Sequence, residues 1–272
     1  MRAPSRQAES RGRWWRFALM LVITVFTLLP IVSIVTAAFG LGGRAGGPGA
    51  GGGWPFLQNF VAIFQYGPAM TWFGNSLAVA AATVLVSVAV GAPAGYVLSR
   101  ARHRLVAGYA LAIFVAQSLP VILFVIPLFI LFAKLGLVDS LVGIGIIYVG
   151  TTVSVAVWMF AAYFDSIPES LEEAAWIDGC SVAGGFARIV LRNSLPGVLS
   201  TAIFSFLVAW NEYLIALVFL RSDANYTLAL GLEASGHSPA LAVVMMLPPL
   251  LIFAFLHRYF SVGGIGGALA GT

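Results

Sequence analysis

EEAAWIDG, residues 172–179, carries an unusual share of the chain's charge. Together with Glu169 it places four carboxylates within ten residues, although the whole chain of 272 residues has only ten acidic side chains. No paired nucleophile and base accompany these acids, which argues against a catalytic group. The stretch could lie on lipid headgroups as an amphipathic connector, but anionic lipids attract Lys and Arg rather than acids. We therefore expect a surface that docks another protein.

The rest of the chain is strongly apolar. Hydrophobic residues make up 60% and charged residues 9% of it, whereas a soluble domain has roughly 25% charged residues. The single cysteine, Cys180, excludes a disulfide framework, and His103, His237 and His257 lie too far apart to suggest a metal site. The composition predicts a membrane protein with several spans and without a metal or other cofactor.

Six apolar runs are long enough to cross a hydrocarbon core of about 30 Å as helices. Backbone groups in lipid must be satisfied internally, so we expect an all-α integral membrane protein with residues 1–16 as a tail and 17–272 as one transmembrane domain. The runs are approximately 17–39, 75–98, 105–132, 141–164, 196–219 and 240–260. The prolines expected to kink them are Pro93, Pro120, Pro127, Pro248 and Pro249. Asn75 and Ser76 are interpreted as the cap of the second run.

The basic residues predict the orientation in the membrane. With the N-terminus in the cytoplasm, eleven arginines lie inside, and only Arg44, Lys134 and Arg221 lie outside. Six spans then place both termini in the cytoplasm, and the net charge of +4 is a topology signal rather than a sign of nucleic-acid binding. The inside residues are Arg2, Arg6, Arg11, Arg13, Arg16, Arg100, Arg102, Arg104, Arg188, Arg192 and Arg258.

The outside stretch 40–53, GLGGRAGGPGAGGG, is glycine-rich and is interpreted as a flexible linker.

The chain has no loop that could bind the phosphates of a nucleotide. Lys134 is its only lysine, so no G-x-x-x-x-G-K-[ST] phosphate loop can exist in it. Energy from a nucleotide, if used, must come from another polypeptide.

The inside loop 165–194 is long enough to hold structure of its own. Ser166 and Glu169 have the spacing of a capping box that opens a short helix. Gly179 is expected to end this helix with a positive φ, and a second short helix is expected before Pro196. We expect two short helices in a compact knob at the membrane surface.

The knob resembles the EAA motif of binding-protein-dependent ABC importer permeases. That motif consists of E-A-A, three residues, G, nine residues, I, one residue and L-P. Its matches at the correct spacings are Glu173, Ala174, Ala175, Gly179, Ile189 and Leu191. Arg192 stands where the motif has proline, so the motif does not predict the geometry at the end of the second helix.

The resemblance covers nearly the whole chain and is greatest to the carbohydrate importers, which include maltose transporters. It rests on NSLAVAAATVLVSVAVGAPAGYVLSR (75–100), LPVILFVIPLFILFAKLGLVDS (119–140), AWNEYLIALVFL (209–220) and YTLALGL (226–232). It implies a type I importer permease fold in a bacterial inner membrane, paired with a second permease. Two copies of an ABC ATPase, an extracytoplasmic solute-binding protein and a sugar would be its other partners.

The same resemblance assigns roles to two segments of the chain. The acidic stretch would be a coupling helix that enters a groove of the ATPase, and the outside loop 221–239 resembles the segment that reaches toward the binding protein. The residues expected to couple to the ATPase are Glu172, Glu173, Ala174, Ala175, Asp178, Gly179 and Ile189.

Glu212 is the one clear charge inside an expected span. A buried carboxylate is costly in lipid and is therefore a functional candidate, and the aromatic neighbours Trp210 and Tyr213 suit the faces of a sugar. These residues and Asn211 could line the substrate pathway, join two subunits or form part of the interfacial aromatic belt. Gln117 and Ser118 are further lining candidates.

Other functions remain open at this point. The range of the family that the chain resembles also includes polyols and glycerol phosphates, so the chain could import one of these instead of a sugar. An ion-coupled secondary transporter would need more intramembrane chemistry than Glu212 supplies, and an intramembrane enzyme would need a nucleophile with a base, or a metal set. The sequence favours the permease of an ATP-driven sugar importer.

Overall fold

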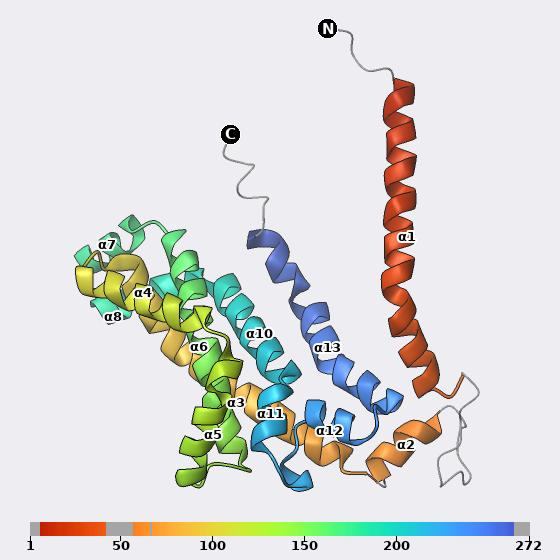
Figure 1. The fold of residues 1–272 in the computed structure, drawn as a ribbon. Helices are drawn as coiled ribbons and strands as arrows, with labels where there is room; N and C mark the ends of the chain where they lie inside the picture. The colour runs from red at the N-terminus through yellow and green to blue at the C-terminus, as the bar shows by residue number, and fades with distance from the viewer. Residues whose placement is uncertain (1–5, 42–56, 66, 264–272) are drawn as a thin grey trace. The chain divides into compact units, whose positions relative to one another are not determined.

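The structure, a computed structural model, describes residues 6–41, 57–65 and 67–263. Every regular element in these ranges is a helix (Figure 1). From residue 42 onward the predicted glycine-rich linker lies outside the described residues. The chain divides into two compact units, one of residues 1–67 and 235–245 and the other of residues 68–234 and 246–272.

The first unit contains α1 (Arg6–Ala38) and α2 (Gln58–Gln65). α1 covers most of the first expected span but begins at Arg6, inside the expected tail, because that tail is rich in residues that favour helices. Asn59 donates a hydrogen bond of 2.9 Å from Nδ2 to the carbonyl oxygen of Ala38, and the Phe39 and Phe60 rings lie 5.1 Å apart. α2 is thereby fastened to the end of α1.

The second unit is built on three helices, α3 (Ala69–Arg100), α6 (Leu141–Asp165) and α10 (Leu195–Asn211), which pack against one another. Small residues allow the close approach of α3 and α6: a Cβ atom added at Gly95 would lie 2.6 Å from Cβ of Phe160. The hydroxyl oxygens of Ser87 and Thr152 lie 2.7 Å apart in the buried interface between these helices. This core supports the segments described below.

Pro120 breaks the third apolar run and does not merely kink it. The run forms α4 (Arg104–Ser118), a 3₁₀ turn (η2, Val121–Phe124) and α5 (Val125–Lys134), and the chain bends by 86° between the two halves (Figure 1). Leu119 is extended, because a residue before proline is pushed out of the helical region. Pro93, by contrast, lies inside the uninterrupted α3.

The fifth apolar run is also interrupted. α10 ends at Asn211, Glu212 is extended, and α11 (Leu214–Phe219) follows. The chain continues through a short 3₁₀ turn (η4, Asp223–Asn225), α12 (Leu228–Ala234) and α13 (Pro239–Gly263), which holds Pro248 and Pro249. Four helices of the described residues are long and apolar enough to cross a membrane. The number rises to as many as six if two sharply bent pairs each count as one span: 104–118 with 121–134, and 182–193 with 195–211.

Candidate functional site

The acidic stretch forms the short helix α7 (Ser170–Ile177). The predicted capping box is not formed. Ser166 caps the C-terminus of α6 with helical dihedral angles, and its hydroxyl donates to the Tyr163 carbonyl at 2.6 Å, so it cannot serve the amides of the next helix. Glu169 is the residue from which α7 begins.

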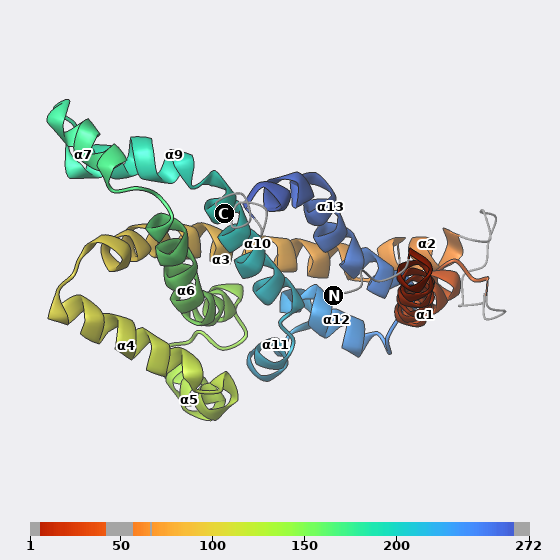
Figure 2. The same cartoon turned by 90° about the horizontal axis from the view of Figure 1, so that it is seen from above.

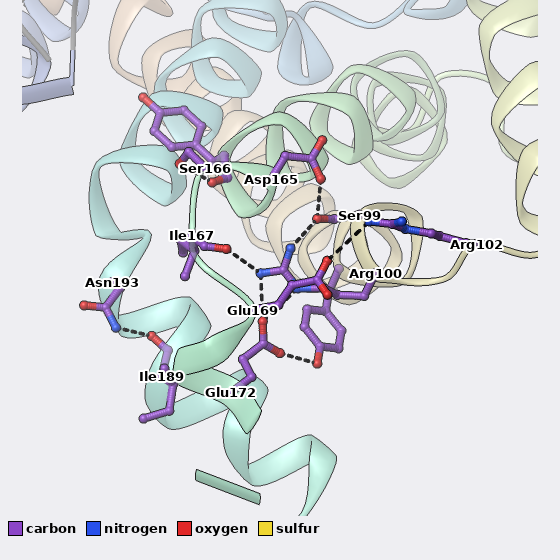
Figure 3. Close-up of polar contacts among 12 residues, drawn as sticks. Ser99, Arg100, Arg102, Asp165, Ser166, Ile167, Glu169, Glu172, Ile189 and Asn193 are labelled. Atoms are coloured by element: carbon purple, nitrogen blue, oxygen red, sulfur yellow. Dashed lines mark hydrogen bonds and ion pairs between the residues drawn. The ribbon is translucent and has the colours of Figure 1, made fainter. Parts of the chain in front are cut away.

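Glu172 is buried and is the centre of a network of polar contacts (Figure 3). Its side chain is 1% exposed and lies 2.7 Å from Nη2 of Arg100, whose Nε also donates to Oε1 at 2.8 Å. The other carboxylate oxygen accepts from the Tyr96 hydroxyl at 2.6 Å. The carboxylate thus forms an ion pair with a guanidinium and a hydrogen bond with a phenol, and these contacts fix α7 to the end of α3.

Arg100 extends the network to the end of α6. It donates to the Ile167 carbonyl at 3.1 Å and to the Ser99 hydroxyl at 2.9 Å, and Ser99 donates to Asp165 at 2.5 Å. Two helix ends and α7 are therefore held by one guanidinium, as Figure 3 shows. We call Tyr96, Ser99, Arg100, Asp165 and Glu172 the Glu172 network. The sequence interpretation missed this role of Arg100, which it took as a basic residue at a membrane boundary.

The opposite side of α7 is open. Glu173, Ala174 and Asp178 are exposed there, and Ile177 is 86% exposed. Ala175 and Ile189 are half-buried. The sequence interpretation also missed the exposed apolar residues next to the acids, which include Leu171, Trp176, Ile177 and Val182. Exposed apolar area beside charged residues is typical of a protein-binding surface.

Gly179 ends α7 with φ +86, as predicted. The Cys180 amide donates to the Ala175 carbonyl at 2.9 Å and the Gly179 amide donates to the Trp176 carbonyl at 3.0 Å, which is the Schellman pattern. A residue with a Cβ is disfavoured at this left-handed position. The turn directs the chain into the second half of the knob, in which Ser181 accepts from the Gly184 amide at 3.1 Å.

The second half of the knob is helical from Val182 to Asn193, with a π turn at Phe186–Val190 (Figure 2). Val190 is fully buried in a cluster with Phe160, Phe164 and Ile167, and the Phe186 ring lies 4.8 Å from that of Tyr96. Arg192 is exposed inside this helix, so the corner before α10 falls at Ser194 and not at the position of the missing motif proline. The chain bends by 78° between the helix that ends at Asn193 and α10.

Glu212 is satisfied within the chain. Its Oε2 accepts from the Tyr148 hydroxyl at 2.8 Å and from the Ala216 amide at 3.1 Å, and its Oε1 accepts from the Ile215 amide at 2.8 Å. The carboxylate caps α11 and joins it to α6. This arrangement explains how the chain accommodates an acid between two apolar helices.

The neighbours of Glu212 have different surroundings. Trp210 is 1% exposed, stacked on Phe206 at 5.4 Å and in edge contact with Phe73 at 5.6 Å, so its ring belongs to the core. Asn211 is exposed and donates to the Leu207 carbonyl at 2.9 Å, whereas Tyr213 is half-buried. The four residues predicted together therefore do not share one surface.

Gln117 and Ser118 lie apart from Glu212, at the bend between α4 and α5. Gln117 lines a hollow of about 590 Å³ between the bent span and α6. A second hollow of about 470 Å³ is lined by Gln117, Ser118, Phe114 and Trp158. Trp158 was missed in the sequence because tryptophan within an apolar run gives no signal of its own.

Asp139 organises the other end of the second unit. Its carboxylate accepts from the backbone amides of Arg221 at 2.9 Å and Ser222 at 3.0 Å, and also from the Ser222 hydroxyl. Asn225 donates from Nδ2 to the Asp139 carbonyl at 2.7 Å. Burial alone would raise the pKa of Asp139, but the hydrogen bonds from Ser222, Arg221 and Asn225 outweigh it and hold this pKa well below its usual range. We call Asp139, Arg221, Ser222 and Asn225 the Asp139 bracket.

The N-terminal part of α3 holds the segment that follows this bracket. Trp72 donates from Nε1 to the Asp223 carbonyl at 2.9 Å, and Asn75 donates to the carbonyls of Ala224 and Tyr226 at 2.9 Å. The Leu228 amide donates to the Ser76 hydroxyl at 2.7 Å. Asn75 and Ser76 therefore do not cap α3, which begins earlier, at Ala69. They fasten residues 224–228 to it.

No group of three or more His, Cys, Asp or Glu side chains in the described ranges could hold a metal ion. The polar clusters of the second unit bind helix ends and loops to one another. Residues 87–262 match the family of binding-protein-dependent transport system inner membrane components. The chain belongs to this family, whose members are the membrane subunits of ABC importers.

Known relatives agree with this assignment. The arabinooligosaccharides transport system permease protein AraQ of Halalkalibacterium halodurans is 33% identical over 78% of this chain and 80% of its own length. The maltodextrin transport system permease protein MdxG of Bacillus subtilis is 26% identical over 94% of this chain and 95% of its own. A chain from the crystal structure of a bacterial ABC transporter involved in the import of the acidic polysaccharide alginate superposes with a TM-score of 0.77, at 20% identity, over 96% of this chain and all of that one.

Proposed function

We propose that this chain is the permease subunit of an ATP-driven importer of a sugar or oligosaccharide, and that its knob docks the ATPase. Membership of the family and the names of two relatives, which transport arabinooligosaccharides and maltodextrin, support the substrate class. The observation that carries the docking role is the orientation of α7, which buries Glu172 and exposes Glu173, Ala174, Ile177 and Asp178.

The two glutamates of the motif have different roles in this proposal. Glu172 is 1% exposed and is bound by Arg100, so it positions α7 from behind and does not touch the ATPase. Glu173 and Asp178 meet basic residues of the ATPase groove, and Ile177 supplies apolar contact area there. The exposed Ala174 lets the groove approach the helix closely.

The complex has the composition expected for the family. Two copies of an ATPase bind this chain and a second permease, and an extracytoplasmic solute-binding protein delivers the sugar. The knob and both termini lie in the cytoplasm of a bacterial cell, in agreement with eleven of fourteen basic residues on that side. The Asp139 bracket then lies on the outside, where it shapes the loop offered to the binding protein.

Glu212 forms part of the wall between the substrate pathway and the helices behind it. Its three acceptor contacts fix α11 against Tyr148, so that Asn211 and Tyr213 are held on either side of a rigid corner. The exposed Asn211 is the residue of this segment that meets the pathway. Trp210 supports the corner from the core.

Charge reversal on the exposed side of α7 tests the docking role. This chain carries a tag and the substitution Glu173→Lys, and it is expressed with the second permease, the ATPase and the binding protein. The amount of ATPase that is recovered with the tagged chain is quantified, and sugar uptake is measured. Glu233→Lys is the matched control because Glu233 is an exposed acid on α12, outside the knob. We expect Glu173→Lys to lose most of the recovered ATPase while the control retains it. Equal recovery from both variants would refute the docking role.

A further inference from the structure

Two hollows of the second unit meet at Gln117. The larger one, of about 590 Å³, lies under the bend of α4 and α5 and is lined on α6 by residues that include Thr151 and Ser154. The smaller one, of about 470 Å³, is lined by Phe114, Gln117, Ser118 and Trp158. Both volumes fall within the roughly 300–1,000 Å³ of small-molecule sites. Because Gln117 lines both, they form one continuous surface along α4 and α6.

The α6 side of this surface follows one stripe of the helix. Ile147, Thr151, Ser154 and Trp158 succeed one another at spacings of three or four residues, so they share one face. The stripe changes from apolar at Ile147 to hydroxyl-bearing at Thr151 and Ser154, and to aromatic at Trp158. An apolar span that turns a polar and aromatic stripe toward a hollow is unlike one that faces lipid only.

Several polar groups on this surface have no partner among the described residues. The Gln117 amide, the Ser154 hydroxyl and the Trp158 indole N–H make no hydrogen bond there, whereas the Thr151 hydroxyl donates to the Tyr148 carbonyl at 2.9 Å. Polar groups within a membrane span are costly unless a partner or water satisfies them. These three groups therefore face something polar in the working protein.

A third hollow of the same unit gives a useful contrast. It has a volume of about 430 Å³ and lies between α3 and α6. Its lining is entirely apolar: Ala78, Val79, Ala82, Val86, Leu141, Val142, Gly145, Ile146 and Val149. An acyl chain or an apolar helix suits that groove, but neither would satisfy Gln117, Ser154 and Trp158. The occupant of the Gln117 surface must carry hydrogen-bonding groups and an apolar face together.

We propose that the Gln117 surface is a saccharide subsite of the translocation pathway, in which one sugar ring stacks on Trp158 while Gln117 and Ser154 bind its hydroxyls. The proposal rests on the proposed function of the chain as a sugar importer. A sugar ring has an apolar face of C–H groups and a rim of hydroxyls, which matches an indole face beside an amide and a hydroxyl. Trp158 is 38% exposed and Phe114 is 59% exposed, so both rings are accessible to a solute.

The test measures sugar preference, because damage to the fold would reduce transport of every sugar equally. The complete complex is placed in liposomes with one fixed binding protein. Uptake is measured for maltotriose, arabinotriose, N,N′-diacetylchitobiose and trehalose, and the two best substrates are kept. Stimulation of ATP hydrolysis by the sugar-loaded binding protein in the wild-type complex tests the proposed function separately.

We expect Trp158→Ala to change the ratio of the two uptake rates by about tenfold, which corresponds to about 1.4 kcal/mol. Trp158→Phe keeps an aromatic face and should restore most of the wild-type ratio. The matched control is Tyr109→Ala, because Tyr109 is an aromatic residue of α4 that is 51% exposed and lines none of the three hollows. An unchanged ratio in Trp158→Ala, or equal changes in Trp158→Ala and Tyr109→Ala, would overturn the subsite.

A second measurement applies even if the Trp158 variants do not assemble. Ser154→Cys in a Cys180→Ser background places one thiol on the surface, and a small water-soluble thiol reagent reports its accessibility. Labelling should be fast in the resting complex and at least several-fold slower when the complex is trapped with vanadate in the presence of the best sugar. A rate that sugar and vanadate do not change would contradict the proposal, as would a thiol that reacts only with lipid-soluble reagents.

Discussion

The Glu172 network and the Asp139 bracket are two ways of holding a segment with one carboxylate. Glu172 is 1% exposed and is bound by the Arg100 guanidinium and the Tyr96 hydroxyl. Asp139 is half-exposed and is bound only by neutral groups, which are two backbone amides and one hydroxyl. The Glu172 network depends on one cation that cannot be replaced by water. In the Asp139 bracket, several donors share the binding of the carboxylate. We therefore expect single substitutions to be far more damaging in the network than in the bracket.

The largest effect is expected for Arg100→Met, which leaves the Glu172 carboxylate buried without its cation. Breaking one partner of a buried pair costs about 3–5 kcal/mol. The melting temperature of the purified complex should fall, and α7 should become sensitive to protease. Arg102→Met is the control, because Arg102 lies 3.9 Å from Glu169 and both side chains are exposed, so its removal should change little. Similar losses in both variants would contradict the comparison.

Gly179→Val should have the next largest effect. A β-branched residue at φ +86 costs about 1–2 kcal/mol and displaces the corner between the two halves of the knob. The variant should reach the membrane but lose most uptake and retain less ATPase on purification. Gly108→Ala is the matched control, since nothing lies within 4 Å of a Cβ added there and no left-handed φ is required. Normal uptake by Gly179→Val would show that this corner is not needed for coupling.

Glu212→Gln extends the comparison to a third carboxylate. The glutamine retains one acceptor oxygen for the α11 amides but removes the charge. The free energy of unfolding should therefore fall by about 1 kcal/mol, the contribution of a typical hydrogen bond. Uptake should fall more than the amount of protein in the membrane. In a Cys180→Ser background, a thiol placed by Asn211→Cys should react with a water-soluble reagent faster than one placed by Glu212→Cys. The reverse order would contradict the assignment of Asn211 to the pathway.

The smallest effect is the pH dependence of the Asp139 bracket. The pKa of Asp139 is lowered in the folded protein from an ordinary value of 3.8, so its stabilising contribution is complete above that value and is lost as the pH falls further toward the folded pKa. Hydrogen exchange at the Arg221 and Ser222 amides should therefore stay constant between pH 7 and pH 5, once the intrinsic rate is corrected, and increase below about pH 4.

Asp139→Asn is the control for this pH dependence. Asparagine tolerates the φ of 58 found at this position, so the substitution removes the charge without adding backbone strain. The protection of the two amides should be weaker at neutral pH and should no longer decrease on acidification. If acidification affected both proteins equally, the carboxylate would not be the titrating group.

The sequence predicted the helices better than their interruptions. Apolar length alone located the spans at 75–98 and 141–164 as α3 and α6, and the requirement for a positive φ identified Gly179 correctly. The break at Leu119 and Pro120 was expected to be only a kink, because a local sequence does not tell whether neighbouring helices hold the two halves in line. The corner at Glu212 was missed for the same reason.

The candidate site was predictable by position but not by role. Glu172 and Glu173 are adjacent and identical in the sequence, yet one is buried and the other exposed. Their difference depends on Arg100, which lies 72 residues earlier in the chain, and no periodicity links the two segments. Gln117 and Ser118 stood out in the sequence as polar residues in an apolar run, and they line a hollow; their place in the pathway stays a prediction, and Trp158 became a candidate only when folding brought α6 beside α4.

α3 connects two distant segments of the chain because each of its ends makes polar contacts with one of them. Its last turns hold α7 through Tyr96 and Arg100, and its first turns hold residues 223–228 through Trp72, Asn75 and Ser76. With 32 residues it is about 48 Å long, so a tilt of roughly 5° about one end displaces the other by about 4 Å. The knob and the loop at residues 223–228 are thus attached to the two ends of one continuous helix, so a change in the tilt of α3 would move one relative to the other.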